Sequence, residues 1–200
     1  MADQTKERYQ RSFKKYGVSP KSLAYWNQEA IDIRYQELLK DIEIEGKSIL
    51  DVGSGFGDII PHLKRKATKF NFIGIDLVPE FVGVARKKYP KHEFIIGDYF
   101  GRPLQEKFDI VFTSGTLNSG LPKKDPVGYR KKAIKTMLDH AREVVSFNMA
   151  GGYPQPENVK NYRVWYANSL EILKYCLSLT PKVIFRHHYR KNDFTIIMYK

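Results

Sequence analysis

At 200 residues with 42% hydrophobic side chains, the chain has the size and composition of one globular domain with a substantial core. It contains no run near the roughly 20 apolar residues that a membrane-spanning helix needs. Its first residues lack the apolar segment of a secretory signal, so we expect a cytoplasmic protein. The single cysteine, Cys176, excludes an intrachain disulfide and a cysteine-rich metal site. Since histidine and carboxylate residues show no clustered spacing, we expect no bound metal.

The formal net charge of +12 is carried by the chain after residue 46, because acidic and basic side chains balance over residues 1–46. Two interpretations stay open. The charges are either ordinary solvated helix faces, or a surface that attracts an anionic substrate such as a nucleic acid or a phosphorylated small molecule. The basic groups lie at 64–66, 86–88, 123–124, 130–132 and 186–191.

The N-terminal part of the chain predicts two helices before any strand. Residues 4–16 are typical of a short polar helix, and residues 27–43 of a second helix with apolar residues at helical spacing. We expect residues 1–46 to form a helical cap, part of the same domain, over the carboxyl edge of the sheet, where α/β proteins bind ligands. Residues 47–200 would form the core of the domain.

The first predicted strand, 47–52, runs directly into a turn with three glycines, Gly53, Gly55 and Gly57. Glycine lets the chain turn sharply and lets a ligand approach the backbone, because it has no Cβ. A helix over 57–66 and a second strand over 71–76, ending in Asp76, complete half of a nucleotide-binding sheet. A carboxylate at that strand end accepts hydrogen bonds from both hydroxyls of a ribose, so we predict an adenosine-bearing cofactor.

The residues around the glycines favour one adenosine cofactor over the others. A dinucleotide fingerprint reads G-x-G-x-x-G, but Asp58 stands where that pattern has its last glycine, and its charge would repel a pyrophosphate. Asp51 and Asp58 together suit a ligand with a cationic group and no phosphate, such as S-adenosylmethionine. The segment resembles the first motif of the class I S-adenosylmethionine-dependent methyltransferases, (D/E)-x-G-x-G-x-G, and the resemblance covers roughly residues 30–200. The alternative is an α/β protein whose glycines only turn the chain.

Beyond residue 76, strands and helices alternate, which predicts an α/β fold with helices on both faces of a parallel sheet. The resemblance implies a single Rossmann-like three-layer domain. Its mostly parallel seven-stranded sheet would have the order 3-2-1-4-5-7-6, with the last strand antiparallel. Long connections at 115–125 and 148–165 would form the substrate side of the site. We expect helices over 79–88, 126–141 and 170–179, and strands over 93–96, 108–113, 143–147, 182–187 and 194–199.

The resemblance also implies roles for residues at the carboxyl edge of the sheet. Asp51 would accept a hydrogen bond from the ammonium group of the cofactor, or serve only as a turn or capping carboxylate. Asp76 would bind the ribose, and Leu77 would pack on the adenine. Asp98 would accept the adenine amino group, or cap a short helix over 99–101. The expected cofactor-binding residues are Arg34, Asp51, Gly53, Ser54, Gly55, Gly57, Asp76, Leu77, Asp98, Tyr99, Ser114 and Gly115.

Arg34 differs from the other expected residues because it comes from the second N-terminal helix. Its planar guanidinium group is a suitable donor to the carboxylate of the cofactor. An arginine on the surface of the molecule is the alternative.

The fourth strand ends in Ser114-Gly115-Thr116-Leu117-Asn118, which in the resembled family lies beside the transferred methyl group. This segment lacks the prolines and the aromatic residue usual in amino-methylating nucleic-acid enzymes. Cys176 lies in a late helix, where a core thiol is its expected role. We therefore predict a small-molecule acceptor, methylated on oxygen or nitrogen by in-line displacement. The catalytic residue stays open, and the candidates are Asn118, Asn148 and His187.

Two other functions stay open. The basic surface also fits an RNA or protein methyltransferase, and RNA binding would then depend steeply on salt. A non-catalytic protein that keeps the cofactor fold is the second alternative, because the sequence identifies the cofactor half of the site and not the acceptor half.

Overall fold

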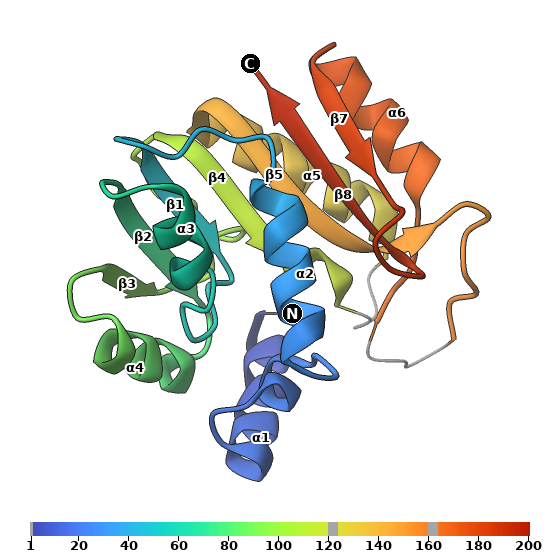
Figure 1. Cartoon of the computed structure of the whole chain (residues 1–200). Helices are drawn as coiled ribbons and strands as arrows, with labels where there is room; N and C mark the ends of the chain where they lie inside the picture. Colours follow the sequence, from blue (N-terminus) through green and yellow to red (C-terminus); the bar gives the residue numbers. More distant parts are fainter. Residues whose placement is uncertain (1, 120–123, 160–163) are drawn as a thin grey trace.

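The computed structural model describes residues 2–119, 124–159 and 164–200, which form one twisted sheet with helices on both sides (Figure 1). Lys123 of the predicted basic pair, and parts of both predicted long connections, lie outside the described residues. The helices, with η for short 3₁₀ turns, are α1 (Ala2–Tyr16), η1 (Pro20–Leu23), α2 (Gln28–Leu39), α3 (Ile60–Lys66), α4 (Pro79–Lys88), η2 (Thr116–Asn118), α5 (Pro126–His140) and α6 (Ser169–Leu179). The strands are β1 (Ser48–Val52), β2 (Asn71–Asp76), β3 (Glu93–Ile96), β4 (Phe108–Ser114), β5 (Ala141–Gly152), β6 (Ala167–Asn168), β7 (Val183–Arg186) and β8 (Asp193–Tyr199).

The sheet has the order β3-β2-β1-β4-β5-β8-β7, and the short β6 pairs with the end of β5 outside this path. β1 is parallel to both of its neighbours, β2 and β4, whereas β8 is antiparallel to both β5 and β7. The predicted order 3-2-1-4-5-7-6 and its antiparallel last strand are confirmed. The short β6, which was not predicted, raises the numbers of the last two strands by one, so they are β8 and β7 here. The chain reverses its direction of travel across the sheet between β1 and β4. Such a switch point opens a crevice at the carboxyl ends of the strands.

Apolar side chains cover both faces of the sheet and hold the helices against it. On one face, Ile134 of α5 and Cys176 of α6 lie in a cluster with residues of β4, β5 and β8. On the other face, Leu38 of α2, Leu63 of α3 and Val82 of α4 lie in a second cluster. Burial of one aliphatic side chain contributes about 1.5–3 kcal/mol to the stability of the folded chain. The two clusters therefore hold in place the strands whose ends form the crevice. The helices in the described part of the chain are all too short or too polar to cross a membrane.

Two expected helices have different bounds in the structure. The helix expected over 27–43 ends at Leu39, where the N–H of Ile42 donates to the Leu39 carbonyl oxygen in a turn (3.2 Å). The helix expected from Gly57 begins at Ile60, because Gly57 has φ +75°, outside the helical region. The short helix expected over 99–101 is a turn. The other expected helices agree with the structure to within a residue or two.

The fifth strand is much longer than the expected 143–147. β5 pairs with β4 along one side and with β8 along the other, so its backbone groups have partners well beyond Phe147. Asn148, expected at the start of a loop, lies inside the strand, and Gly151 pairs with β6. A buried amide and a glycine pair interrupt the apolar pattern, which is why the sequence underestimates this strand.

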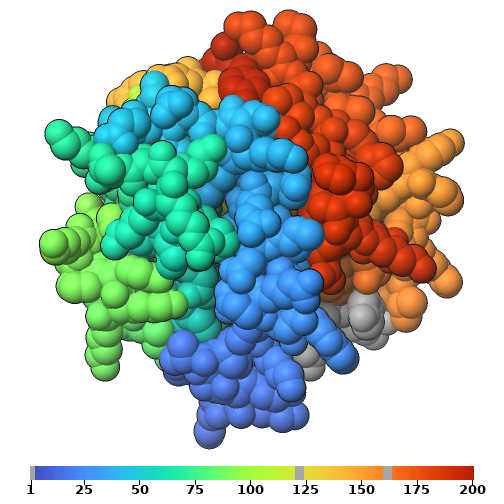
Figure 2. Space-filling view, in the orientation of Figure 1, coloured from blue at the N-terminus to red at the C-terminus, as the bar shows by residue number. Residues whose placement is uncertain are grey.

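α1 and α2 lie in different places, although both were expected to cover the edge of the sheet. α1 does lie at the crevice, where the rings of Tyr9 and Phe13 contact Phe81 of α4 (centroids 6.0 and 5.8 Å apart). α2 instead packs on one face, with Ile31 and Leu38 in the core. Its apolar side is better buried against a sheet face than against an edge. Figure 2 shows α2 flush between α3 and the C-terminal strands, whereas α1 forms the lower end of the molecule.

Candidate cofactor-binding site

A cavity of about 290 Å³ opens at the carboxyl ends of β1, β2 and β4, at the switch point of the sheet. Its volume is close to the lower end of the range for small-molecule sites. Among the described residues, histidine, cysteine and acidic side chains form no group of three or more that is suited to a metal ion. The expected cofactor-binding residues in its wall are Arg34, Gly53, Ser54, Gly55, Asp76, Leu77, Asp98, Tyr99, Ser114 and Gly115. Asp51 and Gly57 lie outside the wall, and of the catalytic candidates only Asn118 lines it.

The glycine turn wraps over the end of β2. The N–H groups of Gly53 and Ser54 both donate to the carbonyl oxygen of Ile75 (2.8 and 3.1 Å). A Cβ on Gly53, at φ +75°, would collide with the hydroxyl of Thr116, so only glycine fits there. A Cβ on Gly57 would lie 2.9 Å from the ring of Tyr89. Gly57 therefore allows the turn to pack on its neighbours and does not face the cavity.

The carboxylate of Asp76 is held at the end of β2 by backbone donors. Its Oδ2 accepts from the N–H of Gly55 and its Oδ1 from the N–H of Val78, both at 2.9 Å. Burial raises the pKa of Asp76 to about 6, although these hydrogen bonds oppose the shift. Each carboxylate oxygen keeps a further lone pair that can accept from a hydroxyl group. The arrangement fits the two hydroxyls of a ribose.

Asp51 and Ser54 each leave a buried oxygen without a partner. Asp51 is 1% exposed, and neither its Oδ2 nor the Oγ of Ser54 makes a hydrogen bond. Burial, together with the charges of Asp76 and Asp58, raises the pKa of Asp51 to about 8. Unsatisfied buried oxygens are costly, and a ligand that donates hydrogen bonds, such as one with an ammonium group, would lower this cost. Ser54 lines the cavity, whereas Asp51 lies in β1 outside its wall.

Asp58 does not face the cavity, contrary to the sequence prediction. Its Oδ1 forms an ion pair with the Nζ of Lys88 on α4 (2.6 Å), and it lies outside the cavity wall. Asp58 therefore pairs with a lysine of the chain, in place of the cationic group expected from the cofactor. Asp51, in contrast, forms no ion pair with another described residue.

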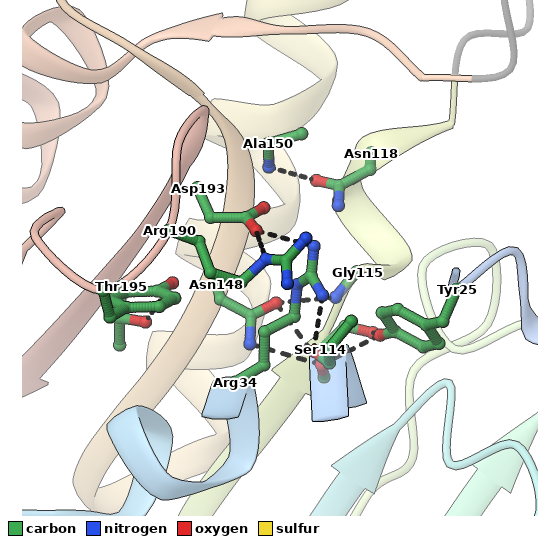
Figure 3. Close-up of polar contacts among 12 residues, drawn as sticks. Tyr25, Arg34, Ser114, Gly115, Asn118, Asn148, Ala150, Arg190, Asp193 and Thr195 are labelled. Carbon is green, nitrogen blue, oxygen red and sulfur yellow. Dashed lines mark hydrogen bonds and ion pairs between the residues drawn. The ribbon is translucent and has the colours of Figure 1, made fainter. Parts of the chain in front are cut away.

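The far end of the cavity is built around the end of β4. The Oδ1 of Asn148 accepts from the N–H of Gly115 (3.0 Å), and its Nδ2 donates to the Oγ of Ser114 (3.2 Å). The hydroxyl of Tyr25 donates to the Ser114 carbonyl oxygen (3.2 Å), and the Oδ1 of Asn118 accepts from the N–H of Ala150 (2.8 Å). Figure 3 shows these side chains joining β4, β5 and the segment before α2. Asn148 therefore fixes the turn and does not reach the cavity.

Two arginines share one carboxylate beside this turn. The Oδ2 of Asp193 accepts from Arg34 Nη2 (2.7 Å) and from Arg190 Nε (3.0 Å). In Figure 3 both guanidinium groups point to the Asp193 carboxylate. The Nε of Arg34 is buried and has no partner. Arg34 thus lies in the cavity wall, and the alternative of a surface arginine is wrong.

On the expected adenine side of the cavity, Asp98 lies in the wall and stabilises a turn in place of the expected short helix. Asp98 lines the cavity, and its Oδ1 accepts from the N–H of Gly101 (3.1 Å), which closes the turn. Tyr99 is buried, and its hydroxyl is 3.2 Å from Nδ1 of His140. His187 is exposed, stacks on Phe185 and lies outside the wall, which removes it as a candidate base.

Sequence reasoning missed part of the wall. Tyr25 gives no signal in the sequence, because nothing local distinguishes it from a core aromatic residue. Arg190 belongs to the predicted basic group 186–191, but its place in the cavity depends on the turn between β7 and β8. The change from that basic run to Asp193 is the one local signal that this turn is more than a solvated loop.

The sheet order and the site together define a class. A glycine turn after β1, an acid at the end of β2 and an antiparallel β8 inserted beside β5 are the features expected of the class I S-adenosylmethionine-dependent methyltransferases. Asp51 and Ser54, next to the glycine turn, each keep a buried side-chain oxygen without a hydrogen-bond partner.

Comparison with known proteins agrees with this class. A family model described as "Methyltransferase domain" matches residues 49–145. The chain is 29% identical over 116 residues to a demethylmenaquinone methyltransferase of Thermotoga maritima (56% of this chain), and it spans only 50% of that enzyme. It is 28% identical over 159 residues to a putative methyltransferase of Mycobacterium tuberculosis (76% of this chain, 93% of that protein).

Solved structures share the fold. A magnesium protoporphyrin IX methyltransferase of Synechocystis with bound S-adenosylhomocysteine aligns over 100% of this chain and 99% of its own. The TM-score is 0.68 at 15% sequence identity. The methyltransferase-domain match and the structural neighbours with bound cofactor together indicate a class I S-adenosylmethionine-dependent methyltransferase.

Proposed function

We propose that this protein transfers the methyl group of S-adenosylmethionine to an oxygen or nitrogen atom of a small molecule. The observation that carries the proposal is the cavity at the switch point. It has Asp76 held by backbone donors on one side and a dense polar junction around Ser114 on the other. The relatives named above are methyltransferases of a quinone and a porphyrin, which favours a small-molecule acceptor.

The roles of the chain's residues follow from their positions. Asp76 would bind the ribose, Asp51 the ammonium group, and the glycine turn would let the cofactor lie against the backbone. When bound, the cofactor supplies a methyl group on a sulfonium. The methyl group would pass to a lone pair of an acceptor held in line with it, as the carbon–sulfur bond breaks with its electron pair on sulfur. The protein's contribution is to orient the acceptor and exclude water, and no side chain is needed as a base for an acceptor that is already nucleophilic.

Calorimetric titration with S-adenosylmethionine, S-adenosylhomocysteine and NAD tests the cofactor assignment. We expect saturable one-site binding of both sulfur compounds and none of NAD. Asp76→Ala and Gly55→Val should abolish it, whereas Asp139→Ala, which removes an exposed carboxylate of α5, should bind normally. Wild-type affinity in both site variants would refute the assignment.

Arg34→Ala separates two roles of the arginine. If Arg34 binds the carboxylate of the cofactor, the variant should bind S-adenosylhomocysteine at least tenfold more weakly, since a charged hydrogen bond contributes about 1.5–3 kcal/mol. Unchanged affinity would show that Arg34 only supports Asp193.

Methyl transfer itself is tested with S-adenosylmethionine labelled in the methyl group and a fractionated metabolite extract. Labelled products of low molecular mass that require Asp76 are the expected result. Label in RNA or protein alone would place the acceptor in another class. Cofactor binding without transfer to any fraction would favour a non-catalytic protein.

A further inference from the structure

The turn between β7 and β8 is fixed against the cavity. The carbonyl oxygen of Asn192 accepts from the N–H of Gly151 on β5 (2.9 Å), and the hydroxyl of Tyr189 is 2.8 Å from Oγ1 of Thr195. These contacts anchor both sides of the turn. Arg190 and Lys191, which lie between the anchors, both line the cavity.

Positive charge exceeds negative charge at this end of the cavity. Arg34, Arg190 and Lys191 line it beside a single carboxylate, Asp193. The other acids of the described wall, Asp76 and Asp98, follow β2 and β3, on the far side of β1 and β4 from β8. One carboxylate offsets one of three cations, so two positive charges remain uncompensated there.

The donors of these cations are only partly used. Arg190 donates through Nε to Asp193, and its two terminal amino groups make no hydrogen bond with another described residue. The ammonium group of Lys191 likewise has no ion pair with a described carboxylate, and Lys191 is exposed. Asp193 holds the Nε of Arg190, and the Arg190 side chain is 36% exposed. Its two terminal guanidinium nitrogens are therefore accessible to a ligand in the cavity that Arg190 lines.

The cofactor does not remove this excess. S-adenosylmethionine brings one carboxylate, which Arg34 is placed to receive, but it also brings an ammonium and a sulfonium. Asp51 would neutralise the charge of only one of those two cations. The acceptor end of the loaded site therefore stays positive, and a guanidinium fork beside an ammonium group is the usual protein receptor for a carboxylate or phosphate.

We propose that the methyl acceptor carries an oxyanion, a carboxylate or a phosphate group, and that the free guanidinium nitrogens of Arg190 and the ammonium of Lys191 bind it. This inference rests on the proposed function, because the positive charge left for the acceptor is known only after the charges of the cofactor have been paired. The oxyanion fixes which end of the acceptor enters the cavity. The positive end also speeds the encounter with an anionic acceptor.

The test uses protein saturated with S-adenosylhomocysteine, titrated calorimetrically with inorganic phosphate and with acetate at constant ionic strength set by chloride. Wild type should bind at least one of the two saturably, and the preferred anion tells a phosphate from a carboxylate handle. The Arg190→Gln/Lys191→Gln variant should lose at least tenfold in anion affinity while its affinity for S-adenosylhomocysteine changes less than twofold. The control variant Arg65→Gln/Lys174→Gln removes the same charge from exposed positions on α3 and α6 and should behave as wild type.

Three results would overturn the inference. These are no saturable anion binding by wild type, equal anion binding by both double variants, or a loss of S-adenosylhomocysteine affinity on replacing Arg190 and Lys191. The last would mean that these cations serve the cofactor. A wild type that fails to bind S-adenosylhomocysteine refutes the proposed function first, so the two failures are distinguishable. Should the double variant fail to fold, the single variant Lys191→Gln, which removes one exposed ammonium group, should still bind the anion more weakly than wild type, and unchanged affinity would overturn the inference.

Discussion

Asp51 shows how burial prepares a single residue for a ligand. With its pKa raised to about 8, chiefly by burial, the carboxyl group is mostly protonated at pH 7 in the free protein. An ammonium group beside it favours the charged form and lowers the pKa again. If the ammonium group of the cofactor binds beside Asp51 as proposed, its binding is coupled to loss of a proton from Asp51.

This coupling predicts proton release on binding. At pH 7, binding of S-adenosylhomocysteine should release close to one proton, and the release should vanish at pH 9, where the carboxyl group of Asp51 is already ionised. Calorimetry in two buffers of different ionisation enthalpy measures the number. Asp51→Asn should bind without this release. Equal release by the variant would assign the proton to another group.

The glycines offer a matched pair of substitutions. Gly53→Ala places a Cβ at φ +75° against Thr116, and the left-handed conformation alone costs about 1–2 kcal/mol, so this variant should be destabilised and bind the cofactor poorly. Gly83→Ala lies in α4 with nothing within 4 Å of the new Cβ. It should stabilise the protein by roughly 0.5–1 kcal/mol. Urea unfolding of both variants checks the opposite signs.

At the scale of elements, Arg130 of α5 holds the loop that follows β4. It was counted in the basic surface at 130–132, but it is 1% exposed, and that part of the prediction is wrong. Its guanidinium donates to the carbonyl oxygens of Leu117 (2.8 Å), Ser119 (3.0 Å) and Pro126 (2.8 Å) and lies 3.8 Å from the ring centroid of Trp165. One side chain thereby ties η2, which carries Asn118 into the cavity wall, to α5 and to the segment before β6.

Removing these donors should destabilise the protein. Arg130→Met removes the donor from one buried and two part-buried hydrogen bonds and should lower the free energy of unfolding by about 3 kcal/mol. Arg130→Lys keeps one donating group, so its free energy of unfolding should lie between those of wild type and the Met variant. Denaturant unfolding gives both values, and a Met variant within 1 kcal/mol of wild type would show that water replaces the arginine.

For the whole molecule, residues from several strands of the one sheet line the cavity, so a ligand that binds only the folded chain should stabilise the fold. S-adenosylhomocysteine at one hundred times its Kd contributes about 2.7 kcal/mol. For a domain of this size each kcal/mol shifts Tm by roughly 2–4 °C, so Tm should rise by about 5–10 °C. NAD at the same concentration should leave Tm unchanged. Thermal unfolding monitored by circular dichroism measures both Tm values. Equal Tm shifts with S-adenosylhomocysteine and NAD would contradict a site selective for the sulfur cofactor.

The cofactor half of the site was predictable because its signals are local. An apolar strand, the glycine turn and Asp76 lie within thirty residues, and glycine at positive φ and a strand-end acid carry their meaning in the sequence itself. The sheet order followed from the alternation of strands and helices together with the family resemblance. Boundaries failed where buried polar residues such as Asn148 interrupted the apolar pattern of a strand with partners on both sides.

The charge pairs in and around the site were decided by tertiary structure. Arg34 and Asp193 are 159 residues apart in the chain and meet only because α2 packs on the sheet face beside β8. Asp58, which looked equivalent to Asp51, is taken out of the site by Lys88 on another helix. The sequence by itself determined the fold class and the cofactor, whose signals act over short distances. Pairings between distant charges depend on how the layers close, and only the folded chain determines those.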